Sequence, residues 1–83
     1  MKFDTEVIIS LKDGMLNPEA STIEKSLALL NYDVENTNTI NIIKFTINCE
    51  NKKEAELKVE EMCQKLLCNP VIHNYEITIN DGV

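Results

Sequence analysis

The chain has 83 residues, of which 43% are hydrophobic and 27% charged, and its formal net charge at pH 7 is -6. A chain of this length forms one domain, here residues 1–83, and buries only about 60% of its unfolded surface, so we expect it to self-associate. Its acidic charge argues against nucleic acid as a partner, and no apolar run approaches the ~20 residues of a membrane span, so we expect a cytoplasmic protein without a membrane partner.

The N-terminal part of the chain predicts a strand followed by a helix. Apolar and polar side chains alternate from Thr5 to Lys12, which is the period of two that buries one face of a strand. Asn17-Pro18 is typical of an N-cap followed by proline at the first helical position, so we expect a helix from Pro18 to near Tyr32. Its apolar residues recur at steps of three and four and form one stripe: Ala20, Ile23, Leu27 and Leu30.

The middle of the chain predicts two strands and a second helix. Thr, Val and Ile are frequent from Val34 to Asn48, and an Asn-containing break near residues 38–41 divides this stretch into two strands. The sequence ENKKEA then precedes a helix that we expect to reach about Cys68, with one apolar stripe and a charged exterior.

Asn69-Pro70 ends the second helix, because the residue before a proline avoids the helical region, and a last strand alternates from Val71 to Ile79. The order βαββαβ predicts an α+β protein with the ferredoxin-like, split βαβ fold. In this fold both helices pack on one face of a four-stranded antiparallel sheet. The other face stays open to a second subunit, and it carries three apolar residues among polar ones: Ile8, Ile42 and Ile72.

Two of the three cysteines and the single histidine lie within eleven residues, and we weigh them as candidates for chemistry: Cys63, Cys68 and His73. On a helix that turns ~100° per residue the two thiols point ~140° apart, so they cannot converge on a metal ion unless the helix has ended. An apolar surrounding also opposes a catalytic thiolate, so we interpret the cysteines as packing residues and His73 as a partly buried residue at the rim of the sheet. With only Gly14 and Gly82, the chain has no phosphate-binding glycine loop.

Two stretches resemble the signature segments of the PurS family, the small subunit of phosphoribosylformylglycinamidine (FGAM) synthase. They are LKDGMLNPEASTIEKSLALLNY, residues 11–32, and LLCNPVIHNYEITI, residues 66–79, and the similarity continues in register over about residues 3–80. The matching residues are Lys12, Gly14, Leu16, Asn17, Pro18, Leu30 and Tyr32, then Leu66, Leu67, Asn69, Pro70, Val71 and Ile72. The sequence departs from the family at Asn38-Thr39-Ile40-Asn41, where many relatives carry an Arg-x-Gly-Lys turn.

The resemblance implies a non-catalytic subunit of purine biosynthesis that forms a homodimer or tetramer. The family's complex converts formylglycinamide ribonucleotide, glutamine and ATP, with Mg²⁺, into FGAM. Within it PurL binds the nucleotides and performs the amidation, while the glutaminase PurQ supplies ammonia. The PurS subunit bridges the two and supports ammonia transfer, so this chain is expected to have no catalytic residue and to bind no cofactor or metal itself.

We expect the contacts with PurL and PurQ in two segments that combine a fixed backbone with partly exposed apolar residues. The residues of this expected interface are Gly14, Leu16, Asn17, Pro18, Asn69, Pro70, Val71 and Ile72. The prolines also fit a simpler interpretation, in which they only mark helix ends. Two other functions stay open on the residues alone: a homodimeric ferredoxin-like module that senses a small ligand, and a stand-alone enzyme that uses Cys68 and His73.

Overall fold

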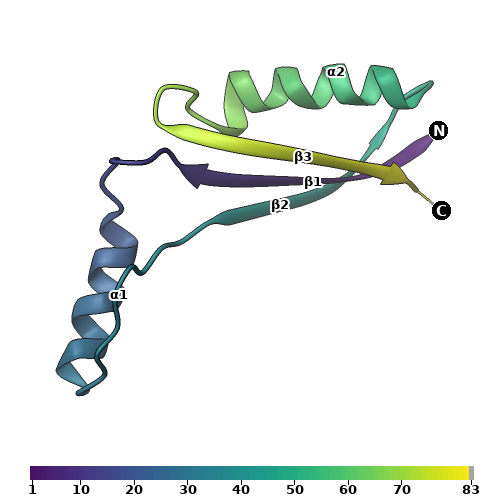
Figure 1. Cartoon of the computed structure of the whole chain (residues 1–83). Coiled ribbons are helices and arrows are strands. Elements are labelled where there is room, and N and C mark those ends of the chain that lie inside the picture. The colour runs from purple at the N-terminus through teal and green to yellow at the C-terminus, as the bar shows by residue number, and fades with distance from the viewer. Residues whose placement is uncertain (83) are drawn as a thin grey trace.

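A computed structural model describes residues 1–82 and has an α+β architecture (Figure 1). In chain order the elements are β1 (Lys2–Leu11), α1 (Pro18–Leu29), β2 (Asn41–Asn48), α2 (Lys52–Met62), a π-helical turn (Cys63–Leu67) and β3 (His73–Asp81). The predicted strands and helices therefore exist at the expected places, apart from one strand.

The three strands form one antiparallel sheet in the order β2-β1-β3. Val7 in the central strand lies opposite Ile43 of β2 and Ile77 of β3, so one face of the sheet is apolar across all three strands. Phe3 and Val7 on this face are at most 1% exposed, which confirms the period-of-two prediction for β1.

Helix α2 covers the apolar face of the sheet on the side of β3 (Figure 1). It begins at Asn51, whose Oδ1 accepts a hydrogen bond of 2.8 Å from the backbone N–H of Glu54. Ala55 and Val59 are fully buried against the strands. The helix continues through the π-helical turn as far as Leu67, so the prediction that it would reach about Cys68 is confirmed.

Helix α1 begins at Pro18, as predicted, but it does not pack on the sheet. It points away from the strands, and only Ala20 of its residues is buried (Figure 1). Together with the segments that join it to β1 and β2 it forms a projection, residues 12–40, which we call the α1 arm. The expectation that both helices lie on one face of the same sheet is therefore not met within this chain.

The expected strand that begins at Val34 is not formed, so the described residues contain a three-stranded sheet and not the predicted four-stranded one. Asn36 has a φ of 57°, which an extended strand does not allow. In addition, no neighbouring strand lies within the arm to pair with this segment. The Thr- and Val-rich composition indicated strand propensity, but propensity without a partner for the backbone hydrogen bonds does not make a strand.

Candidate functional site

The two segments expected to contact partners come together at one end of the sheet. The backbone N–H of Lys12, at the end of β1, donates a hydrogen bond of 2.8 Å to the carbonyl oxygen of Ile72, just before β3. Residues 12–18 and 69–72 therefore form one surface, which we call the arm base. Sequence alone placed these segments far apart in the chain, and the pairing of β1 with β3 brings them together.

The first half of the arm base is a turn that requires its glycine. Gly14 has a φ of 81°, a left-handed conformation that L side chains rarely adopt. No atom lies within 4 Å of where a Cβ would stand, so the backbone angle and not lack of space selects glycine here. The turn leaves Leu16 85% exposed.

Asn17 links the segment that precedes α1 to the segment that follows it. Its Oδ1 accepts a hydrogen bond of 3.0 Å from the N–H of Ala20, which confirms the predicted N-cap. Its Nδ2 donates to Asn38 Oδ1 at 3.1 Å and to Thr39 Oγ1 at 3.0 Å. Asn38 and Thr39 belong to the segment in which this sequence departs from its relatives, and sequence reasoning gave them no role. The contact joins residues 21 or more apart, so nothing in the local pattern pointed to it.

The second half of the arm base is a tight turn built on Asn69. Its side-chain Oδ1 accepts from the N–H of Val71 at 3.0 Å, and its carbonyl oxygen accepts from the N–H of His73 at 2.8 Å. In return the N–H of Asn69 donates to His73 Nδ1 at 2.9 Å. Val71 is consequently 76% exposed on a backbone that these bonds fix. An exposed apolar side chain on a rigid turn suits a protein contact and offers no catalytic group.

The two thiols near His73 lie closer together than the helical prediction allowed. The π-helical turn places the N–H of Cys68 against the carbonyl oxygen of Cys63 at 2.9 Å, and the two thiols are near enough for each to influence the pKa of the other. The angle of ~140° holds only for an α-helix, so the prediction that these side chains diverge is wrong. Both cysteines are nevertheless buried and free, as the packing interpretation expected.

Neither thiol is activated as a nucleophile. Burial raises the pKa of Cys63 to about 11, and burial also raises the pKa of Cys68. His73 has its Nδ1 occupied by the N–H of Asn69. Within residues 1–82, no three His, Cys, Asp or Glu side chains are grouped so as to hold a metal ion.

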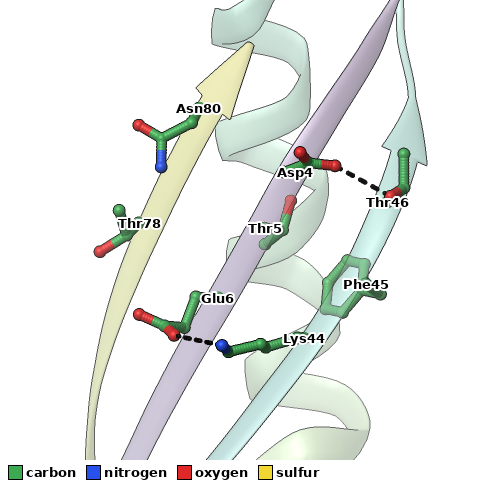
Figure 2. A pocket seen from close by; sticks show the side chains of 8 residues that line it. All are labelled: Asp4, Thr5, Glu6, Lys44, Phe45, Thr46, Thr78 and Asn80. Carbon is green, nitrogen blue, oxygen red and sulfur yellow. Dashed lines mark hydrogen bonds and ion pairs between the residues drawn. The ribbon is translucent and has the colours of Figure 1, made fainter. Parts of the chain in front are cut away.

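The open face of the sheet is polar. This face has a shallow hollow of about 500 Å³, and side chains of all three strands line it (Figure 2). Thr46 Oγ1 donates to Asp4 at 3.0 Å, and Lys44 Nζ lies 3.6 Å from Glu6 (Figure 2). The Lys44–Glu6 pair neutralises part of the charge of this face, and the hollow is lined by no cysteine or histidine. The expected apolar character of this face is limited to a few positions such as Ile42, which is 51% exposed.

No helix among the described residues is long and apolar enough to cross a membrane.

Comparison with known proteins agrees with the geometry of a binding protein. The model of the PurS family, described as phosphoribosylformylglycinamidine (FGAM) synthase, matches residues 4–81. The chain belongs to the PurS family. The PurS subunit of FGAM synthase from Methanothermobacter thermautotrophicus is 58% identical over 81 residues, which are 98% of this chain and 96% of that protein.

Solved structures of PurS proteins share the fold. One, of the PurS subunit of FGAM synthetase, is 58% identical, superposes with a TM-score of 0.92 and covers 94% of this chain and 93% of its own. At that coverage the superposition includes the α1 arm, so the projecting arm is common to both proteins. The structure of PurLQS from Thermotoga maritima contains a chain that is 26% identical, with a TM-score of 0.82 and coverage of 96% and 99%.

Proposed function

We propose that this protein is the PurS subunit of FGAM synthase in purine biosynthesis. It bridges the glutaminase PurQ and the synthetase PurL, and it supports the transfer of ammonia between them. The observation that carries this function is the family match over residues 4–81, joined to a likeness to a chain of the PurLQS structure over 96% of this chain.

The protein's contribution to the reaction is structural. Burial raises the pKa of the Cys63 and Cys68 thiols, and the Nδ1 of His73 accepts a hydrogen bond from a backbone N–H, so these residues offer no activated nucleophile or base within residues 1–82. In this proposal ATP and Mg²⁺ belong to the partner subunits, this chain binds neither, and the assembly works in the cytoplasm. A small rigid scaffold can align two enzymes without adding a reacting group.

We place the contact with PurL and PurQ at the arm base. Leu16 and Val71 are 85% and 76% exposed, and both project from backbone that hydrogen bonds hold in place. Apolar side chains that are fixed before binding lose little conformational freedom on association, so they are favourable anchors for a partner.

Leu16→Asp and Val71→Asp test this placement. We expect each to weaken assembly with PurL and PurQ at least about tenfold, because a carboxylate then has to be desolvated in the contact. The measurement is co-elution of the three proteins by size-exclusion chromatography, with circular dichroism to confirm the fold.

Leu29→Asp is the matched control, since Leu29 is also 85% exposed but lies at the far end of α1. It should leave assembly unchanged. Equal loss of assembly in Leu29→Asp, or full assembly of the Leu16 and Val71 variants, would contradict the proposed contact.

A further inference from the structure

Asn69 is the acceptor for most of the backbone hydrogen bonds in the turn that leads into β3. Its carbonyl oxygen accepts from the N–H of Ile72 at 3.0 Å and from the N–H of His73 at 2.8 Å, and its Oδ1 accepts from the N–H of Val71 at 3.0 Å. Pro70 has no N–H to donate. The conformation of the whole turn therefore depends on the position of Asn69.

The N–H of Asn69 itself donates to a side chain. Cys68 has left the helical conformation, with a φ of -130° and a ψ of 158°, so the N–H of Asn69 does not continue the hydrogen bonding of the π-helical turn. It donates instead to His73 Nδ1 at 2.9 Å. A nitrogen of imidazole accepts a hydrogen bond only when it carries no proton, so this bond requires a neutral ring with its proton on Nε2.

The acceptor on His73 projects from the sheet and not from the turn. His73 is the first residue of β3, and it lies opposite Leu11 at the end of β1. Its side chain is partly buried. The bond from Asn69 to His73 therefore ties the turn to the most ordered part of the chain, the pairing of β1 with β3.

We propose that His73 is a positioning residue for the contact with PurL and PurQ. Its ring fixes Asn69, and Asn69 fixes the backbone from which Val71 projects into the arm base. A side chain on a fixed backbone loses less conformational freedom on binding, so the hydrogen bond to His73 strengthens the contact although the ring does not touch the partner. The inference rests on the proposed function, because the arm base is where we place that contact.

Three substitutions of His73 test whether the position of the acceptor matters. His73→Leu removes the acceptor. His73→Asn attaches an amide oxygen to Cγ, where histidine carries Nδ1, whereas His73→Gln places the oxygen one bond further out. We expect the backbone N–H of Asn69 to exchange with solvent about tenfold faster in His73→Leu and His73→Gln, and at nearly the wild-type rate in His73→Asn.

Hydrogen exchange followed by NMR on the chain alone measures this effect, and circular dichroism checks the fold. The comparison of His73→Asn with His73→Gln carries the test if His73→Leu does not fold. Wild-type exchange of the Asn69 N–H in His73→Gln, or equally fast exchange in His73→Asn, would overturn the proposal.

The affinity of the same variants for PurL and PurQ, measured by isothermal titration calorimetry, tests the consequence for binding. His73→Gln should bind at least about fivefold more weakly than wild type, and His73→Asn should bind nearly as tightly as wild type. Equal loss in both variants would show that the ring itself contacts a partner, and wild-type affinity in both would show that the turn needs no fixing. Either result would overturn the positioning role. A wild-type chain that binds neither PurL nor PurQ would instead contradict the proposed function, while the exchange measurement on the chain alone would still decide whether His73 holds the turn.

Discussion

Single residues decide where the chain turns, and sequence reasoning identified most of them. Asn17 and Pro18 were predicted to start a helix, and the N-cap bond from Ala20 confirms it. The second set of bonds of Asn17, to Asn38 and Thr39, could not be predicted, because it depends on how the two connections of the arm meet in space. Side-chain periodicity indicates local backbone geometry, but it does not predict contacts between residues far apart in the chain.

The pair Cys63 and Cys68 shows a related limit at the same scale. The predicted angle between the two side chains was correct for an α-helix. In the π-helical turn, however, the backbone hydrogen bond joins residues five apart instead of four, which changes the direction of the side chains. This shift brings the two thiols together. No feature of the sequence CQKLLC distinguishes a π-helical turn from an α-helical one.

The buried thiol of Cys63 predicts a loss of stability at alkaline pH. Burial raises its pKa from 9.0 to about 11, so the folded state favours the neutral thiol. The stabilisation of the folded state by the neutral Cys63 thiol is complete below the pKa of the unfolded state, and it is lost as pH rises from about 9 through about 11. The free energy of unfolding in urea should therefore fall more for wild type than for Cys63→Ala over that range. A difference between the two proteins that stays constant with pH would contradict this prediction.

Elements were predicted better than their arrangement. The apolar stripe of α1 indicates a face suited to burial, but it does not identify the element that would cover it, and only Ala20 of the helix is buried. The same ambiguity explains the missing strand after Val34, since strand propensity does not supply a neighbouring strand. By contrast, β1 and α2 pack against each other within one chain, and for them pattern and structure agree.

The N-cap residue of α2 stabilises this helix, so removing the capping side chain should lower the stability of the protein. Asn51→Ala should lower the free energy of unfolding by about 1 kcal/mol, because the N–H of Glu54 loses its acceptor while α2 carries buried core residues. Urea denaturation measures this change. Lys53→Ala, an exposed substitution in the same turn, is the control and should change stability little. Equal stability of Asn51→Ala and wild type would contradict the role of the cap.

At the scale of the whole molecule, the protein is a scaffold with a small buried core and a large accessible surface. Its extents of 53 × 29 × 15 Å describe a thin body, with a sheet at one end and the α1 arm at the other. The arm base carries the exposed residues Leu16 and Val71 between these two parts. The exposed arm base therefore lies between the sheet and the arm, at the surface where we propose that PurL and PurQ bind.

In our proposal this chain makes two other enzymes work together without performing chemistry itself. Glutamine-dependent amidation of formylglycinamide ribonucleotide by PurL and PurQ, assayed with and without this chain, tests it most directly. We predict that the reaction depends on the chain, that the chain alone has no activity, and that PurL still accepts free ammonia without it. Equal glutamine-dependent rates with and without the chain would contradict the proposed role of this protein.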